Sequence, residues 1–256
     1  MKSFNKEFLR ALKTLKSNFF GGISLVIFLL FAFILIFSSE YLFKSGFSDN
    51  YELYLLTAKL IAFLVFLSPL HYGIFLWFNE SQLGFKHAVW ESLGFFTSLR
   101  LIFRSAFHRL TFILMYMLCL SPTFILLCLG WASIKIAIIN AQTEFLILGF
   151  CFFMVFIPFC ILTLIFLSRF SLSTYIFVTN PDISVLSSFI LSYKATKGKS
   201  VFLYKCKTRL FLINALTLFM IPISISVDYL TMSSLCSKIY SDSAVKIHWQ
   251  TFSVRV

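Results

Sequence analysis

His71 has the most promising position for chemistry in this sequence. It lies within an apolar run from Leu60 to Phe78 that contains no Asp, Glu, Lys or Arg. An ionisable group inside a membrane span typically serves as a proton relay or a ligand contact. A neutral imidazole that is hydrogen-bonded to a neighbouring helix is the simpler explanation, and both interpretations stay open.

Two further polar side chains belong to the last apolar run of the chain. Asn214 lies inside this run and Asp228 lies at its outer end. An Asn can join neighbouring helices by a hydrogen bond worth about 0.6–2 kcal/mol in a membrane. Asp228 fits a cation path, although a helix-end carboxylate facing headgroup water explains it more simply.

A cluster of basic residues precedes that last run and is the strongest candidate for a binding surface. Near a membrane, each such charge attracts anionic lipid with about 1 kcal/mol. The same charges also set the topology of the chain, and the two roles are compatible. The members of this basic cluster are Lys194, Lys197, Lys199, Lys205, Lys207 and Arg209.

The other arrangements of reactive residues predict no enzyme. His87 and Glu91 stand one helical turn apart with Glu80 nearby, but a mixed-charge interfacial helix explains this spacing better than a metal site does. The sequence contains no phosphate-binding loop, no G-x-S-x-G and no carboxylates paired at catalytic spacing. The six cysteines form no C-x-x-C pair. We therefore expect no catalytic residue, no cofactor and no metal.

The composition of the chain places it in a lipid environment. Of 256 residues, 59% are hydrophobic, 12% are charged and 35 residues are Phe, and the mean hydropathy is +0.91. Soluble domains carry about 25% charged residues. The net charge of +12 does not indicate a nucleic-acid partner, because the basic residues flank apolar runs, where the positive-inside rule accounts for them.

The apolar runs predict an all-α fold, a polytopic transmembrane helical bundle with cytoplasmic interfacial amphipathic helices. A basic N-terminal helix over residues 1–20 carries Phe4, Phe8, Leu12, Leu15 and Phe19 on one face. Each membrane span needs about 20 apolar residues, and the tail over 231–256 is too polar to supply another clear one. We expect five clear spans, at about 21–43, 58–78, 110–131, 145–178 and 208–230.

Two further amphipathic helices are expected between the spans. In the first, Arg100, Arg104 and His108 share one face, and Leu99, Phe103, Ala106, Phe107 and Leu110 lie largely on the other. The second follows Asn180-Pro181-Asp182, with Asp182 or Ser184 as its N-cap and Gly198 at its end. Its predicted apolar side carries Val185, Leu186, Phe189, Ile190 and Tyr193.

The distribution of Lys and Arg predicts which segments are cytoplasmic. Sixteen of the 22 basic residues lie before the first span, between the second and third spans, or in the fourth connection, which for this count runs from Arg169 to Arg209. The positive-inside rule assigns these segments to the cytoplasm. The N-terminus is then cytoplasmic in a bacterial inner membrane, and five spans would leave the tail outside.

Several short motifs resemble the YciC-like family of uncharacterised bacterial polytopic membrane proteins, and the same order is similar to the membrane region of some glycerophosphodiester phosphodiesterases. This resemblance implies a helical bundle, commonly with six spans, and brings no established activity. Here only Leu210 to Val227 is a convincing run near the end, so Ser224 to Tyr240 stays open as a sixth, short or re-entrant segment. The motifs are Pro69-Leu70-His71-Tyr72-Gly73, Ile157-Pro158, the stretch from Tyr175 to Ser184, and Lys197-Gly198 before Leu210-Phe211, with Tyr229 and Ile239-Tyr240 as a further piece.

Together these features predict a non-enzymatic membrane protein that organises anionic lipid, a protein partner or further copies of itself. The alternative is a small transporter or permease subunit with His71 in the path of its substrate.

Overall fold

The computed structural model describes residues 2–43, 51–84, 88–140, 142–180, 182–217 and 220–242. Within these ranges the chain forms helices joined by turns and contains no strand, which confirms the predicted all-α class. In chain order the helices are α1 (Lys2–Ser17), α2 (Phe19–Phe43), α3 (Tyr51–Ala62), η1 (Phe63–Leu67, a π-helix), α4 (Ser68–Gln82), η2 (Val89–Phe96, a 3₁₀-helix), α5 (Leu99–Asn140), α6 (Thr143–Ser168), α7 (Leu172–Thr179), α8 (Val185–Ala195), α9 (Ser200–Leu216) and α10 (Ile221–Ser241).

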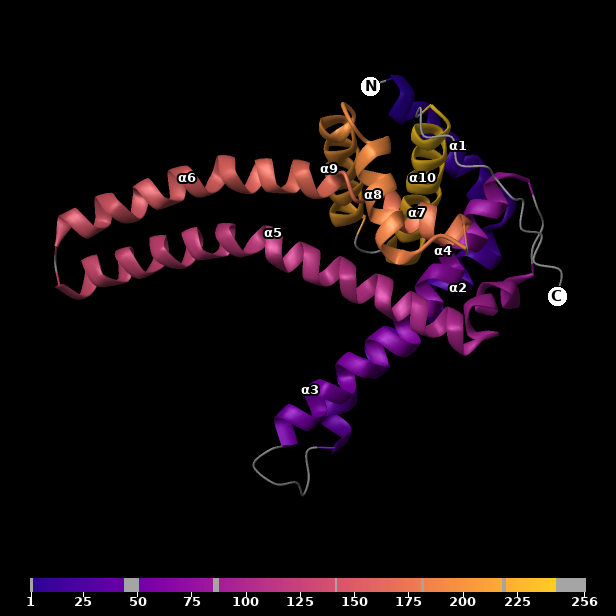
Figure 1. Ribbon diagram of the computed structural model, residues 1–256, viewed down its shortest axis with the longest axis horizontal. Helices are drawn as coiled ribbons and strands as arrows, with labels where there is room; N and C mark the ends of the chain where they lie inside the picture. The colour runs from indigo at the N-terminus through magenta and orange to yellow at the C-terminus, as the bar shows by residue number, and fades with distance from the viewer. Residues whose placement is uncertain are drawn as a thin grey trace.

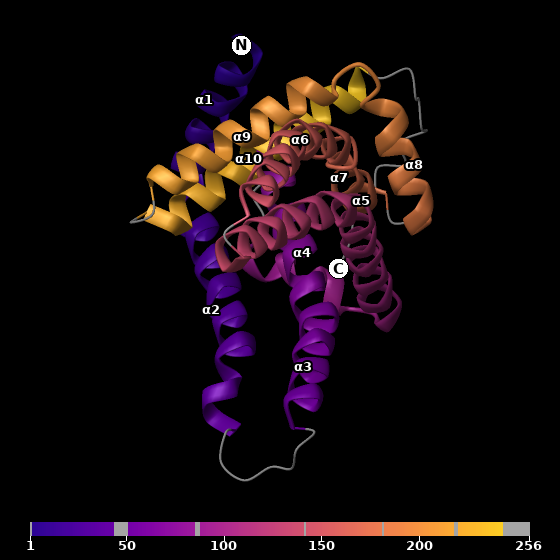
Figure 2. The same cartoon turned by 90° about the vertical axis from the view of Figure 1, so that its left-hand side faces the viewer.

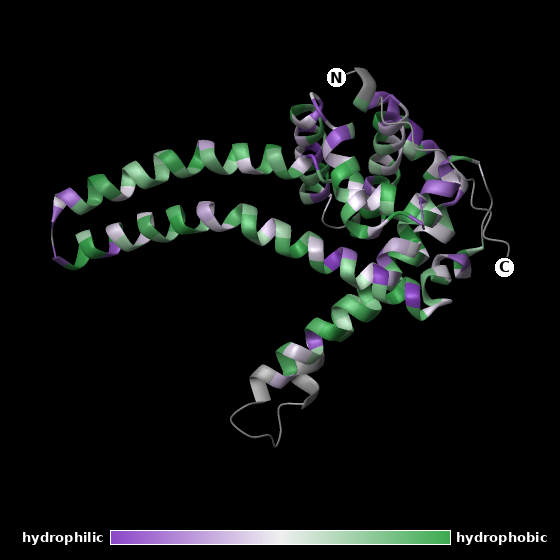
Figure 3. Ribbon diagram, viewed as in Figure 1, coloured by the Kyte–Doolittle hydropathy of each residue, from purple (hydrophilic) through white to green (hydrophobic). Residues whose placement is uncertain are grey.

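Two long hairpins project from a compact helical body. Figure 1 shows α5 and α6 running side by side away from the remaining helices. Figure 2 shows α2 and α3 leaving the body together in a different direction. The body consists of α1, α4, η2 and α7 to α10, together with the ends of the hairpin helices. Both hairpins are mostly apolar (Figure 3).

Four stretches are long and apolar enough to cross a membrane by length and composition. They are Phe19–Ser38, Tyr54–Gln82, Leu99–Asn140 and Thr143–Thr179, and they contain the first four predicted spans or most of each. At 1.5 Å per residue, the 42 residues of α5 extend about 63 Å, roughly twice the thickness of a bilayer core. The surplus of α5 is its N-terminal part, which packs into the body.

The seam of the α5/α6 hairpin explains why its large side chains point outward. On α5 the buried residues of the apolar part are Thr123, Gly130, Ser133 and Ala137. Across from them, a Cβ on Gly149 would lie 2.7 Å from Ile134 Cγ1 and 3.2 Å from the Gly130 carbonyl oxygen. Small residues at such seams let membrane helices approach closely, while Leu, Ile and Phe face the lipid.

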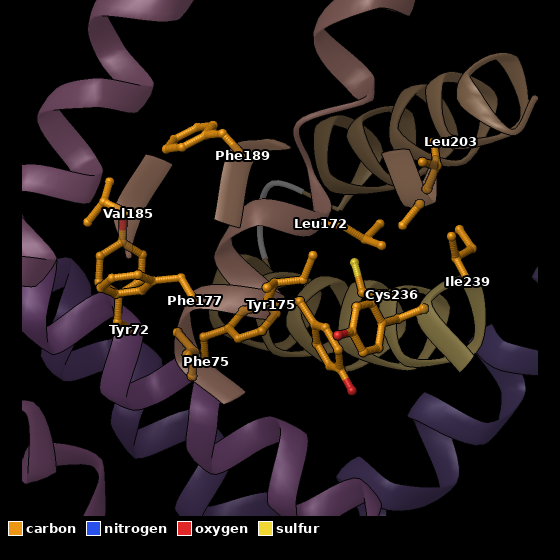
Figure 4. Packing of buried hydrophobic residues seen from close by; sticks show 14 of the residues in the cluster. Tyr72, Phe75, Leu172, Tyr175, Phe177, Val185, Phe189, Leu203, Cys236 and Ile239 are labelled. Carbon is orange, nitrogen blue, oxygen red and sulfur yellow. The ribbon is translucent and has the colours of Figure 1, made fainter. Parts of the chain in front are cut away.

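The centre of the body is α10, which packs against α1, α2, α4, α7 and α9. Its buried residues alternate between apolar side chains such as Leu230 and Leu235 and hydroxyl side chains such as Ser226 and Ser233. Figure 4 shows the neighbouring aromatic core, in which Tyr72 and Phe177 lie together and Tyr175 lies near Cys236. This core joins α4, α7 and α10.

The predicted fifth span over 208–230 is wrong as a single helix. The segment is divided between α9, which ends at Leu216, and α10, which begins at Ile221. The two helices pack against each other within the body (Figure 2). Pro222 stands in the first turn of α10, where its missing N–H is tolerated, so it starts this helix and does not interrupt a longer one.

The first part of the expected polar tail from residue 231 is helical, as is the whole stretch from Ser224 to Tyr240 that was left open as a further segment. α10 continues to Ser241 and buries Leu235, Cys236, Ile239 and Tyr240. Hydropathy averaging missed this segment because its serines and threonines are buried beside these apolar residues. Residues 243–256, the rest of that predicted tail, lie outside the described residues.

The N-terminal helix is confirmed as α1, and part of its predicted apolar face is buried in the protein. α1 packs along α10 with Phe4, Glu7, Ala11 and Leu15 buried. Two other residues of the predicted apolar face, Leu12 and Phe19, are exposed, and Phe19 begins α2. Glu7 is buried because it has a hydrogen-bonding partner on α10, a contact that a hydrophobicity pattern does not reveal.

Candidate functional site

His71 lies on α4 directly after a break in helical geometry. The π-helix η1 ends at Leu67, and Ser68 donates from both its backbone N–H and its hydroxyl to the Phe63 carbonyl. Pro69 follows and has no N–H to donate. Isolated π-turns inside α-helices occur frequently at functional sites.

The imidazole of His71 has a buried nitrogen without a partner. Its Nδ1 is shielded from solvent and accepts or donates no hydrogen bond within the described chain. The ring packs against Tyr229 at 5.5 Å between centroids and Tyr72 at 5.3 Å. The simpler prediction, an imidazole satisfied by a neighbouring helix, is therefore not met at Nδ1.

Arg109 on α5 lies on the same side of α4 as His71. Its Cζ atom stands 5.2 Å from the centroid of the Tyr72 ring, a cation–π contact. Its Nε is buried and has no hydrogen-bond partner in the part of the chain that the structure describes. Among the described residues, Arg109 forms no ion pair with a carboxylate. The sequence identified Arg109 only as a topology charge, because its proximity to His71 depends on how α4 and α5 pack.

His71 and Arg109 both line one cavity of about 240 Å³. The remaining walls are apolar and come from Leu29, Leu30 and Phe33 of α2 and from Phe63 and Leu67 of η1. The cavity thus lies where the α2/α3 hairpin leaves the body. It combines one permanent positive charge and one imidazole with a largely hydrocarbon wall.

His108 shows how the two predicted faces of the first turns of α5 are oriented. It is fully buried and shares a hydrogen bond of 2.8 Å between its Nδ1 and the Tyr72 hydroxyl. Its ring lies 4.3 Å from that of Phe177. Leu99, Phe103 and Phe107, by contrast, are exposed. The part of the polar face that carries Arg104 and His108 therefore points into the body, whereas Arg100 and the apolar residues point outward.

Arg104 shows why the polar face turns inward. Its guanidinium donates to the backbone carbonyls of Asn180 and Ile183, the former at 3.1 Å, and lies over the Phe177 ring. Asn180 is the C-cap of α7, and Ile183 precedes α8. Arg104 thereby fixes the segment between α7 and α8 to α5.

The helix predicted after Asp182 is confirmed as α8, and Ser184 is its N-cap. The Ser184 hydroxyl accepts from Ser187 N at 3.2 Å, and Gly198 adopts a left-handed conformation (φ +77°) beyond its end. Val185 and Phe189 are buried as expected, whereas Leu186 and Ile190 are exposed. Ser188, Ser192 and Ala195 fill the other buried positions, and Ser192 donates to the Arg169 carbonyl at 2.6 Å.

The structure brings Asn214 and Asp228 together between α9 and α10. Asn214 Nδ2 donates to Asp228 Oδ2 at 3.4 Å. Burial raises the pKa of Asp228 to about 6, although the Asn214 hydrogen bond and the Lys207 ammonium act in the opposite direction. Burial likewise lowers the pKa of Lys207. The two candidates that the sequence treated separately therefore form one polar contact inside this helix pair.

The six residues of the basic cluster do not form one surface. Lys194, Lys197 and Lys205 are exposed. Lys199 lies 3.8 Å from the Asp242 carboxylate. Lys207 is turned toward α10, and Arg209 places its Cζ 5.7 Å from the Phe4 ring of α1. Only the first three residues are thus directed to the outside without a protein partner, as far as the described residues show.

Glu7 is a buried polar residue that sequence reasoning missed. Its Oε2 accepts from the Ser234 hydroxyl at 2.5 Å, and its Oε1 lies 3.7 Å from Lys238 Nζ. A lone Glu in a basic amphipathic helix was the available signal. This contact ties the N-terminal helix to the C-terminal half of α10.

The arrangement of His87, Glu91 and Glu80 gains no support as a metal site. His87 lies outside the described residues, and Glu91 Oε1 accepts from Ala88 N at 3.2 Å at the start of η2. Among the described residues no group of three or more His, Cys, Asp or Glu side chains could hold a metal ion.

Comparisons with protein-family models, with curated proteins and with solved structures found no match to this chain. The resemblance to the YciC-like family therefore stays a prediction. The features of the site must be interpreted from the chain itself.

Proposed function

We propose that this chain is a four-span integral membrane protein, without enzymatic activity, that organises anionic lipid or a partner at the cytoplasmic face. Two apolar hairpins would anchor it, and the helical body would lie on the cytoplasmic side. The observation that carries this proposal is the division of the molecule into hairpins with exposed hydrocarbon and a body that holds most of the basic residues.

The contact between α1 and α10 supports four spans. A fifth crossing over 208–230 would place residues 231–241 outside the cell and α1 inside. Glu7 of α1, however, accepts a hydrogen bond from Ser234 of α10, so the two segments lie on the same side. The three lysine- and arginine-rich segments also all belong to the body or to helix ends that enter it.

Two surfaces of the body suit the headgroup region. On α1, Lys6, Arg10 and Lys13 are exposed next to Leu9 and Leu12. Helices that expose lysines beside large apolar side chains bind anionic membrane surfaces through both charge and hydrocarbon burial.

The second surface is on α8 and the start of α9. Leu186 and Ile190 are exposed on α8, and Lys194, Lys197 and Lys205 are exposed after them. We call these three lysines the exposed lysine set.

This proposal is tested by measuring how much lipid remains bound to the purified protein. Replacing the exposed lysine set by Gln is expected to lower the number of anionic phospholipids that co-purify, because about 1 kcal/mol per charge is lost. Lys207→Gln is the matched control, since Lys207 faces α10 and should leave that number unchanged. Equal anionic lipid in all three proteins would contradict the surface role.

A transporter is the second candidate, and the geometry around His71 favours it. The π-helix and Pro69 interrupt α-helical geometry directly before His71, as broken helices do at substrate sites of transporters. If this function holds, His71→Ala abolishes a pH-dependent flux in proteoliposomes. Wild-type protein that shows no flux at any pH argues against transport.

A further inference from the structure

The cavity between α2, η1 and α5 carries two buried nitrogen atoms that nothing in the described protein satisfies. These are Nδ1 of His71 and Nε of Arg109. A buried polar group without a partner costs about 1–3 kcal/mol, and more when it is charged. Both residues line the cavity, so a ligand there could remove this cost.

The chemistry of the cavity selects an anion that carries hydrocarbon. Arg109 offers a planar set of donors suited to phosphate, and His71 adds a further nitrogen beside it. The other walls, from α2 and η1, are apolar. A fully hydrated anion would find only these two polar groups, whereas an amphiphilic anion matches both parts of the cavity.

A second hollow lies farther from the body on the same hairpin. It measures about 490 Å³ and is lined only by apolar side chains, including Ile36 of α2, Ala58 and Ile61 of α3, and Phe66 of η1. Along α2 it follows the first cavity by about one turn, from Phe33 to Ile36. The order from the body outward is therefore first charge and then hydrocarbon, as in a phospholipid that lies along the hairpin.

We propose that this cavity binds the headgroup phosphate of one anionic phospholipid, with Arg109 and His71 as its ligands and an acyl chain along the α2/α3 hairpin. The inference rests on the proposed function, because it requires that the hairpin is embedded in the bilayer. It differs from the surface role in naming one lipid at one site.

The test counts lipids on the full-length protein by native mass spectrometry after reconstitution in nanodiscs. The nanodiscs contain phosphatidylcholine alone or with phosphatidylglycerol. When detergent competes for the site, the wild-type protein is expected to keep one phosphatidylglycerol molecule more firmly than it keeps phosphatidylcholine. Arg109→Gln should weaken this retention about tenfold, the loss expected for one charge-assisted hydrogen bond.

Leu30→Trp provides a variant that leaves both nitrogen ligands in place and fills the cavity with a larger ring. It should displace the same lipid, while Arg109→Lys should retain part of the binding. If Arg109→Gln does not fold, Leu30→Trp decides the question. The proposal would be overturned if Leu30→Trp retained phosphatidylglycerol as firmly as the wild type does. It would also be overturned if the wild type retained phosphatidylcholine as firmly as phosphatidylglycerol.

Two further measurements separate this site from its alternatives. Inorganic phosphate that binds the protein as well as the lipid does would show a site for a free anion and overturn the lipid assignment. Replacing the exposed lysine set by Gln should leave the single retained lipid in place. If that replacement alone removes the lipid, the surface role stands and the cavity proposal fails.

Discussion

The α5/α6 hairpin and the α9/α10 pair were both expected to cross the membrane, yet they are built in opposite ways. In the apolar part of α5/α6, small and hydroxyl side chains fill the seam, and Leu118, Met154 and many others are exposed. In α9/α10, polar side chains make contacts across helices, as Asn214 does with Asp228. The outward apolar side chains of α5/α6 are therefore suited to contact with lipid, and the polar contacts of α9/α10 are suited to packing within the body.

The difference shows that an apolar run is insufficient to define a span. The decisive feature of α10 is its set of hydroxyl groups, several of which have partners on other helices. Ser233 donates to Asn79 at 2.6 Å, and Ser226 donates to the Gly22 carbonyl at 3.4 Å. Such pairs compensate for burial of polar groups and keep α10 inside the body.

The largest expected effect concerns the side of the membrane on which the end of each helix pair lies. A cysteine at Ile138, exposed near the end of α5, should react fully with a membrane-impermeant maleimide added to intact cells. A cysteine at Ser241, exposed at the end of α10, should react only after lysis. Because the chain has native cysteines, labelling of the parent protein is the control. Labelling at Ser241 in intact cells would restore a fifth crossing.

The second prediction concerns the seam of α5/α6. Gly149→Ile places atoms where a Cβ alone would already lie 2.7 Å from Ile134 Cγ1. The helices must separate, and we expect a loss of about 3 kcal/mol in the free energy of unfolding. Thermal unfolding in detergent measures it, with Leu148→Ile at an exposed neighbouring position as the control. An unchanged melting temperature would show that the close seam is not required.

The third prediction concerns the contact that places α1 beside α10. Glu7→Ala leaves the Ser234 hydroxyl without its acceptor and Lys238 without this carboxylate, at a cost of about 2 kcal/mol. Faster proteolysis within α1 should accompany the loss of stability. Lys13→Ala, on the exposed side of α1, is the control and should have little effect.

The smallest expected effect is a pH dependence that originates in α9/α10. Because the pKa of Asp228 is raised to about 6, the folded state holds this proton more tightly than the unfolded state. Its contribution to stability is therefore full at low pH and is lost as the pH rises through 6.

The amount lost between pH 5 and pH 7 is about 1 kcal/mol. Melting temperatures at the two pH values measure it in the wild type and in Asp228→Asn, which should lack most of this decrease. Asp242→Asn changes a carboxylate with an exposed side chain and should retain the decrease. An identical pH profile in Asp228→Asn would assign the effect to another group.

Much of the fold could be predicted, but the orientation of its polar side chains could not. The apolar runs predicted the first four spans, and Ser184 was identified as a cap from its local context. The face that His108 shares with Arg100 and Arg104 was predicted, but the burial of His108 against Tyr72 was not. An amphipathic pattern defines two faces of a helix, and without the neighbouring helices it does not say which face is inside.

For the candidate site, too, single residues could be identified from the sequence, but their contacts could not. His71 was found from its position in an apolar run, whereas Arg109 was not, since the two residues are 38 positions apart and meet only when α4 packs on α5. Asn214 and Asp228 were both identified as candidates, yet their contact follows from the packing of α9 against α10.

The sequence by itself determined a helical, lipid-compatible chain with a basic side, because composition and helical periodicity are local properties. Only the tertiary structure decided that the last apolar run folds back into the body, that His71 shares a cavity with Arg109, and that the exposed lysine set is half of the basic cluster. These features depend on pairs of groups distant in the chain, and their energies arise only when helices pack and each buried polar atom gains or lacks a partner.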